Sequence, residues 1–216
     1  MEKVLFTRAG IVGRPNVGKS TLFNCLLGRT RAIVGDFAGV TRDYKEELLE
    51  LKNFSIQLVD TAGLKSSLNT EQDKMINWHT LNLINQLDII LFVIDGREGI
   101  TLEDKEIFQI CRKLNKFIIL VVNKVETAAI EQRFLQEEIT FFGLSNIICV
   151  SSEHRIGIEN VVNTLEYICQ ENGFESIKED KIDYKKKPIN IAIVGRPNVG
   201  KSTLVNSIVK QQRFVT

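Results

Sequence analysis

The chain has 216 residues and a formal net charge of +1, and 44% of its residues are hydrophobic and 25% charged. This composition is typical of a globular protein with one domain of ordinary size and some chain to spare, and it offers no basic field that would by itself indicate binding to DNA or RNA. The longest apolar runs, such as residues 117–122, are far shorter than the ~20 residues of a membrane span, and the amino terminus lacks the apolar core of a signal peptide. We therefore expect a cytoplasmic protein with neither membrane nor DNA as a partner.

Strand-like and helix-like segments alternate from residue 9 to residue 170. The apolar runs at 88–94 and 117–122 are nearly unbroken, as expected of strands that are covered on both faces. Gly28 is typical of a helix end, and Thr101 with Asp104 is typical of a helix start. This alternation predicts an α/β fold with helices on both faces of a mainly parallel sheet. The expected strands are 9–12, 44–51, 54–59, 88–94, 117–122 and 146–150, and the expected helices are 19–27, 71–86, 102–114, 126–142 and 158–170.

A repeated segment divides the chain. The letters IVGRPNVGKSTL run from Ile11 to Leu22 and again from Ile193, which lies 182 residues after Ile11, about the length of one domain. Residues 171–188, ENGFESIKEDKIDYKKKP, are charged and poor in large apolar side chains, which is typical of a linker. We therefore predict a first domain at 1–170, a linker at 171–188, and the first strand, glycine loop and helix start of a second domain at 189–216.

The repeated glycine loop fits the pattern G-x-x-x-x-G-K-[ST], placed between a strand and a helix. Its glycines let successive backbone N–H groups point at phosphate oxygens, and the following helix adds its positive end. The lysine is expected to reach the β- and γ-phosphates, and the serine hydroxyl to bind Mg²⁺. The pattern indicates a nucleoside triphosphate without saying which one. The first copy is Gly13, Arg14, Pro15, Asn16, Val17, Gly18, Lys19 and Ser20, followed by Thr21; the second is Gly195, Arg196, Pro197, Asn198, Val199, Gly200, Lys201 and Ser202.

A second candidate segment, Asp60-Thr61-Ala62-Gly63, follows the predicted strand that ends at residue 59. A carboxylate at this place can hold a water of the Mg²⁺ ion, and the glycine N–H can meet the γ-phosphate. The alternative is an ordinary turn at a strand end. Thr41, in the loop before the preceding strand, offers a hydroxyl to the same metal, and this assignment depends more on a family pattern than on chemistry.

Two further segments suit recognition of the base. Asn123-Lys124-Val125-Glu126 follows a buried strand, and an acidic side chain there can accept hydrogen bonds from N1–H and the exocyclic amine of guanine. Adenine has no matching pair of donors, so such a site selects strongly between the purines. Ser151-Ser152-Glu153 follows the last strand and can support the base through backbone N–H groups. The alternative for both segments is a solvated turn.

Together these motifs resemble the translation-factor-type GTPases with a Ras-like G domain, a P-loop NTPase three-layer sandwich with a mainly parallel six-stranded sheet. The repeated GRPNVGKST and the segment VIDGREGIT at 93–101 resemble the bacterial Der/EngA family of tandem GTPases. The resemblance implies GTP hydrolysis and a role in assembling the large ribosomal subunit, with its rRNA and proteins as partners. Members of that family carry two G domains and a KH-like domain, so the chain is expected to be a truncated form that stops early in its second G domain.

The resemblance also implies a mechanism. The family has a hydrophobic residue where Ras has its water-orienting glutamine, and Leu64 fits that position. Asn16 is expected to help hold a K⁺ ion, whose charge replaces an arginine finger; the alternative for Asn16 is a role in loop conformation alone. The expected catalytic residues are Lys19, Thr41, Gly63 and Asn16, and the expected metal ligands are Ser20, Thr41 and Asp60 for Mg²⁺ and Asn16 for K⁺.

The chain departs from the family at Glu126, where the family pattern N-K-x-D has aspartate. Glutamate keeps the charge but is one methylene longer, so we predict a preference for GTP that is retained but weakened, by about 1–3 kcal/mol. The second glycine loop is expected not to bind nucleotide usefully, because some 28 residues bury too little core. The alternatives to an enzyme are a GTP- and GDP-dependent binding switch, a truncated product without a stable role and, least favoured, a P-loop ATPase or kinase.

Overall fold

The computed structural model describes residues 7–28, 45–64, 70–137 and 141–174. The chain divides into two units, Met1–Glu179 and Asp180–Thr216, and the second lies outside the described residues, as do Thr41 and the second glycine loop. No helix within the four described ranges is long and apolar enough to cross a membrane. Among the described residues of the first unit, 11 elements follow one another: β1 Arg8–Val12, α1 Lys19–Leu26, β2 Lys45–Glu50, β3 Ser55–Asp60, α2 Glu71–Asn85, β4 Ile89–Asp95, α3 Leu102–Arg112, β5 Phe117–Asn123, α4 Ala128–Glu137, β6 Ile147–Cys149 and α5 Ile158–Glu171.

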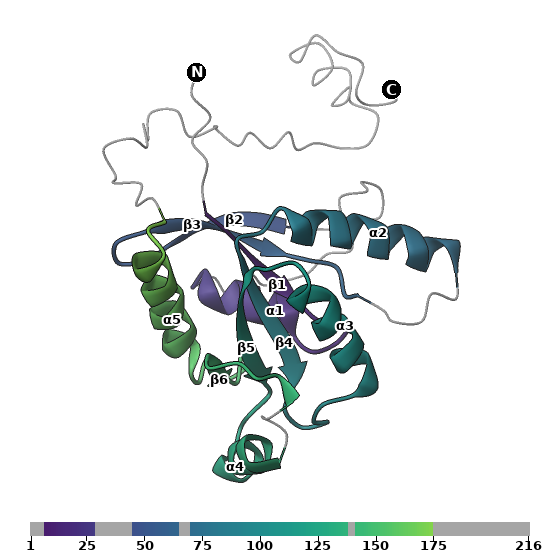
Figure 1. The fold of residues 1–216 in the computed structure, drawn as a ribbon. Coiled ribbons are helices and arrows are strands. Elements are labelled where there is room, and N and C mark those ends of the chain that lie inside the picture. The colour runs from purple at the N-terminus through teal and green to yellow at the C-terminus, as the bar shows by residue number, and fades with distance from the viewer. Residues whose placement is uncertain (1–6, 29–44, 65–69, 138–140, 175–216) are drawn as a thin grey trace, which may run out of the picture. The chain divides into compact units, whose positions relative to one another are not determined.

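The strands form one six-stranded sheet in the order β2-β3-β1-β4-β5-β6 (Figure 1). β2 runs antiparallel to β3, and the other neighbouring pairs are parallel. The predicted α/β fold with a mainly parallel six-stranded sheet is therefore confirmed. Because parallel strands end at the same edge, the segments that follow β1, β3, β4 and β5 emerge side by side, which is where open α/β sheets bind their ligands.

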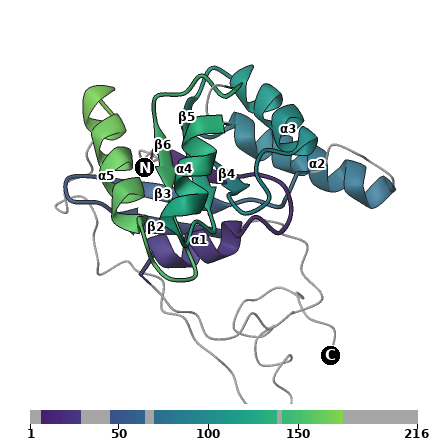
Figure 2. The same ribbon diagram turned by 90° about the horizontal axis from the view of Figure 1, so that it is seen from below.

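Helices cover both faces of the sheet (Figures 1 and 2). One core cluster joins α1 and α5 to the sheet through side chains such as Phe23 and Leu165, and the other joins α2, α3 and α4 through side chains such as Ile84, Phe108 and Phe134. Every residue of β4 is buried, because this central strand has a helical layer on each side.

The predicted helix at 126–142 starts two residues too early, because α4 begins at Ala128; its described part runs to Glu137, and residues 138–140 lie outside the described residues. The hydroxyl of Thr127 accepts the N–H of Ile130 at 3.4 Å, as a helix-capping residue does. At the other end, Phe142 lies in a turn and is buried in the core.

The first residues of the predicted linker, 171–174, are part of the first domain. α5 includes Glu171, and Gly173, with φ of 65°, ends the helix in a left-handed turn. The N–H of Phe174 donates to the carbonyl of Cys169 at 3.1 Å, which completes a Schellman cap. The ring of Phe174 packs edge-on against Phe117 with centroids 5.9 Å apart, so residues 171–174 belong to the domain. The remaining domain boundaries stay predictions, since residues 175–216 lie outside the described part.

Candidate nucleotide-binding site

The phosphate loop, residues 13–20, connects β1 to α1. Its backbone takes left-handed conformations at Asn16 (φ 66°) and Gly18 (φ 94°). A Cβ atom added to Gly13 would lie 2.3 Å from the carbonyl oxygen of Val93, and one added to Gly18 would lie 2.3 Å from Nδ2 of Asn123. The two glycines are therefore required by close packing of the loop against β4 and β5.

Lys19 is the buried cation of this loop. Its ammonium group donates to the carbonyl of Arg14 at 2.8 Å, and the residue is only 7% exposed. Burial lowers the pKa of Lys19 to about 8; the nearby Asp60 carboxylate opposes this shift, and the Arg14 cation adds to it. An ammonium group placed in this way can bind a polyanion, because the negative charge of the anion would stabilise the protonated form that burial disfavours.

Ser20 and Asp60 form a pair of oxygen ligands. The Ser20 hydroxyl donates to Oδ2 of Asp60 at 2.7 Å, while Oδ1 of Asp60 is buried and has no hydrogen-bond partner among the described residues. Burial raises the pKa of Asp60, against the opposing effects of Ser20, Lys19 and Lys45. A buried carboxylate oxygen that lacks a partner, beside a serine hydroxyl, suits a hard divalent cation such as Mg²⁺ or a water that the ion holds.

The segment after Asp60 lies against the phosphate loop. A Cβ atom on Gly63 would lie 2.7 Å from the backbone nitrogen of Pro15, and the N–H of Leu64 donates to the carbonyl of Gly13 at 3.2 Å. The hydroxyl of Thr61 donates to the carbonyl of Ile11 at 2.7 Å, so this side chain anchors the turn. The side chain of Leu64 is buried in the core beside α2 and α3, and so only its backbone faces the phosphate loop.

Asn123 joins the predicted base-recognition segment, residues 123–126, to two other loops. Its Nδ2 donates to the carbonyl of Val17 at 2.9 Å, and its Oδ1 accepts the backbone N–H of Ser152 at 3.0 Å. Lys124 donates to the carbonyl of Asn16 at 2.9 Å and pairs with Oδ2 of Asp95 at 2.6 Å. Residues 123 and 124 thus contact the phosphate loop, and Ser152 contacts Asn123. The assignment of these segments to the base stays a prediction.

The side chain of Glu126 is partly exposed, and its carboxylate has two neighbouring side chains. Its Oε1 pairs with the guanidinium group of Arg97 and lies 3.8 Å from Nε2 of His154. The hydroxyl groups of Ser151 and Ser152 are buried and have no hydrogen-bond partner in the described part of the chain. The neighbouring Glu153 is exposed, whereas Val125 is buried and donates its N–H to the carbonyl of Val150 at 2.9 Å.

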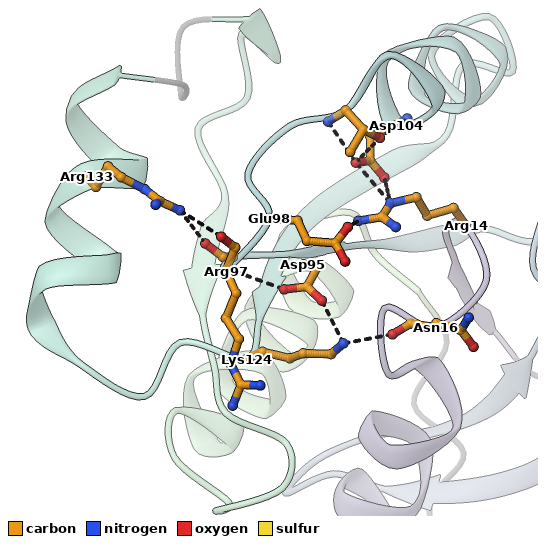
Figure 3. A network of polar contacts seen from close by, with 10 residues as sticks. Arg14, Asn16, Asp95, Arg97, Glu98, Asp104, Lys124 and Arg133 are labelled. Atoms are coloured by element: carbon orange, nitrogen blue, oxygen red, sulfur yellow. Dashed lines mark hydrogen bonds and ion pairs between the residues drawn. The ribbon is translucent and has the colours of Figure 1, made fainter.

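The side chain of Arg14 is paired with two carboxylates. Its guanidinium group pairs with Glu98 and, at 3.2 Å, with the fully buried carboxylate of Asp104 (Figure 3). Burial lowers the pKa of Arg14, but the carboxylates of Asp104 and Glu98 outweigh it and the net shift is upward. The side chain of Arg14 is therefore committed to carboxylates, and its backbone alone is available to a ligand in the phosphate loop.

Sequence reasoning missed the segment at 95–101 as part of the site. Asp95 accepts the N–H of Arg97 at 2.9 Å and pairs with Lys124. Burial alone would raise the pKa of Asp95, but hydrogen bonds from Lys124 and from the backbone N–H groups of Arg97 and Glu98 lower it. The letters DGREGIT were the available signal, but they do not say which loops these side chains contact.

Comparisons with known proteins agree with this geometry. The family model described as "50S ribosome-binding GTPase" matches residues 8–124 and 190–216. The chain is 40% identical over 208 residues to GTPase Der of Thermotoga sp. (strain RQ2), covering 94% of this chain and 46% of that protein, and 37% identical over 212 residues to GTPase Der of Rhodopseudomonas palustris (strain BisA53). The chain spans about half the length of these curated relatives.

Solved structures of Era have the same fold as the first unit of this chain. A variant of Era from Aquifex aeolicus bound to GDP and AlF4⁻ superposes with a TM-score of 0.64 at 30% identity, covering 74% of this chain and 56% of that chain. Era in complex with MgGDPNP and a segment of 16S ribosomal RNA superposes with a TM-score of 0.65 at 31% identity, covering 74% of this chain and 55% of that chain. The sheet order, the phosphate loop and these matches agree, and the chain belongs to the 50S ribosome-binding GTPase family.

Proposed function

We propose that the chain binds GTP with Mg²⁺ and hydrolyses it to GDP and inorganic phosphate. The observation that carries the proposal is the meeting of separate loops around a buried ammonium group and a buried carboxylate, those of Lys19 and Asp60. The backbone N–H groups of the phosphate loop and Lys19 would hold the phosphates. Ser20 and Asp60, with Thr41 from outside the described residues, would hold Mg²⁺, which when bound neutralises charge on the phosphate oxygens.

Base selection is assigned to Glu126, with Asn123 and Lys124 holding the loops together. A carboxylate at this position would accept both hydrogen-bond donors on the guanine edge and would be left unpaired by adenine. The extra methylene of glutamate predicts weaker binding than an aspartate would give. If a titration shows ATP bound as tightly as GTP, this assignment of Glu126 is wrong.

Hydrolysis is proposed to depend on charge rather than on a water-orienting side chain. Leu64 has no hydrogen-bonding group, and its side chain is buried in the core. We assign the missing positive charge to a K⁺ ion near Asn16, whose side chain is exposed at the turn of the phosphate loop. The buried Leu64 equally favours a second candidate, a binding switch that distinguishes GTP from GDP with little turnover.

A phosphate-release assay separates the two candidates. The enzyme is expected to release phosphate faster in KCl than in NaCl of equal ionic strength, and Asn16→Ala is expected to remove the difference. A rate that stays at the uncatalysed level in both salts, with GTP bound, would favour the switch. Lys113→Ala, an exposed lysine beyond the end of α3, is the matched control and is expected to behave as the parent.

A role in large-subunit assembly, with rRNA and proteins of that subunit as partners, is proposed from the family and from the Der relatives. The structure of Era with a segment of 16S ribosomal RNA supports RNA as a partner for this kind of protein. The test is co-sedimentation of the chain with purified 50S subunits. Retention with a non-hydrolysable GTP analogue and release with GDP are expected; equal retention in both states would contradict a nucleotide-controlled role.

A further inference from the structure

The segment at 95–101, which we call the strap, lies between the phosphate loop and the base-recognition segment. It follows β4 and reaches the first turn of α3 (Figure 3). At one end Asp95 pairs with Lys124 at 2.6 Å, and Lys124 in turn contacts the carbonyl of Asn16. At the other end Glu98 pairs with Arg14 of the phosphate loop. The strap therefore contacts both halves of the nucleotide site.

The backbone of Arg97, in the middle of the strap, is held by two hydrogen bonds, and that of the neighbouring Gly96 by two more. The N–H of Arg97 donates to Oδ1 of Asp95 at 2.9 Å, and its carbonyl accepts Nη2 of Arg133, from α4, at 3.2 Å. The neighbouring Gly96 donates its N–H to the carbonyl of Asn123 at 2.7 Å and accepts Arg133 at 2.9 Å. These bonds fix the Cα atom of Arg97 relative to the end of β5, from which Glu126 follows three residues later.

The side chain of Arg97 reaches the carboxylate of Glu126. The guanidinium group contacts Oε1, and the two side chains are 50% and 28% exposed. A carboxylate has about four acceptor positions on its two oxygens, so one contact from arginine leaves room for the two donors of a guanine edge. Glutamate has one more rotatable bond than aspartate, and its carboxylate must therefore lose more freedom to be held against a base. A charge-assisted contact from a fixed backbone removes that freedom before the ligand arrives.

We propose that Arg97 is a positioning residue that holds the Glu126 carboxylate for the base and thereby sets the preference for guanine. The inference rests on the proposed function. It also predicts that Arg97 matters because residue 126 is a glutamate. An aspartate would carry its carboxylate about 1.5 Å closer to the backbone, one C–C bond, and away from the guanidinium group.

The test compares the dissociation constants of GDP and of xanthosine diphosphate (XDP) in excess Mg²⁺. XDP has the same ribose and phosphates but replaces the exocyclic amine of guanine with an oxygen. We expect Arg97→Ala to weaken GDP binding about three- to tenfold and XDP binding less than twofold, because only GDP uses the positioned carboxylate. In a chain that already carries Glu126→Asp, the same Arg97→Ala change is expected to alter GDP affinity less than twofold. Arg97→Lys, which keeps the charge, is expected to restore part of the loss.

Several outcomes would overturn the inference. An equal loss for GDP and XDP would mean that Arg97 only supports the loops, and unchanged or tighter GDP binding would mean that Arg97 competes with the base. An equally large effect in the Glu126→Asp chain would remove the link to the glutamate. The matched control is Arg112→Ala, an exposed arginine at the far end of α3, with circular dichroism to check folding. A parent chain that binds no guanine nucleotide would overturn the proposed function as well, whereas GDP binding that ignores Arg97→Ala would overturn this inference alone.

Discussion

At the scale of single residues, the site depends on ionisable side chains held away from water. Lys19 is charged below a pKa of about 8 in the folded chain, against 10.5 for an ordinary lysine, because burial disfavours the ammonium form. Below pH 8 the lysine is protonated in both folded and unfolded chains, and its burial costs folding free energy in full. Between pH 8 and 10.5 the unfolded chain binds more protons than the folded one, so this cost is relieved as pH rises. A triphosphate needs the charged form, and its binding therefore has the opposite pH dependence.

The first prediction concerns this lysine. Between pH 7 and pH 8.5 the affinity for GTP is expected to fall about fourfold, since an increasing fraction of the unliganded protein has lost the Lys19 proton. Isothermal titration calorimetry at fixed Mg²⁺ and ionic strength measures this. The weaker residual binding of Lys19→Ala is expected to be flat over the same range. A flat profile in the parent chain would contradict the lowered pKa.

At the scale of elements, one carboxylate serves two parts of the fold. Asp104 accepts the backbone N–H of Thr101 at 3.0 Å, and Thr101 accepts the N–H of Asp104 at 3.2 Å, which forms the capping box of α3. The same carboxylate binds Arg14, 90 residues earlier, and so joins the start of α3 to the phosphate loop. The ordering of the loop and the start of the helix are thereby coupled.

The second prediction separates these two roles. Asp104→Ala is expected to lower the free energy of unfolding by about 3 kcal/mol, because it removes the Asp104 half of the capping box and deprives the mostly buried Arg14 of one of its two carboxylates. Thr101→Ala removes the hydroxyl half of the capping box, leaves the Arg14 pair in place and is expected to cost about 1 kcal/mol. Urea denaturation measures both, with Glu106→Ala on the exposed side of α3 as a control. Equal losses for the two variants would mean that the Arg14 pair adds nothing.

At the scale of the whole molecule, the residues assigned to the nucleotide come from loops at one edge of the sheet. A ligand that contacts these loops binds the folded chain and not the unfolded one, so it must stabilise the fold. The described site residues all belong to the first unit.

The third prediction follows from this arrangement. GTP with Mg²⁺ at 100 times its dissociation constant is expected to stabilise the chain by about 2.7 kcal/mol and to raise the melting temperature by about 5–10 °C. Lys19→Ala should abolish the shift. Lys201→Ala, the same change in the second glycine loop, should leave it intact. If the shift is lost with Lys201→Ala and kept with Lys19→Ala, the nucleotide binds the second unit and the prediction is wrong.

Local signals in the sequence were sufficient for most of the fold. Unbroken apolar runs predicted β4 and β5 because these strands are covered on both faces, and the capping box predicted the start of α3 because its hydrogen bonds are local. The start of α4 was placed two residues too early and residues 171–174 were assigned to the linker, because the turn before Thr127 and the cap involving Gly173 depend on how the chain turns next to the sheet. A local sequence pattern does not specify where a helix that packs on the sheet begins or ends.

The sequence by itself determined the order of the elements and predicted the class of ligand, since the apolar runs and the glycine loop each act through neighbouring residues. Tertiary structure alone decided which charges meet. Arg14 with Asp104, Lys124 with Asp95 and Arg97 with Glu126 are between 29 and 90 residues apart in the chain, and only the parallel sheet brings the loops that carry them to one edge. Such pairs depend on distance in space, which spacing in the sequence does not specify.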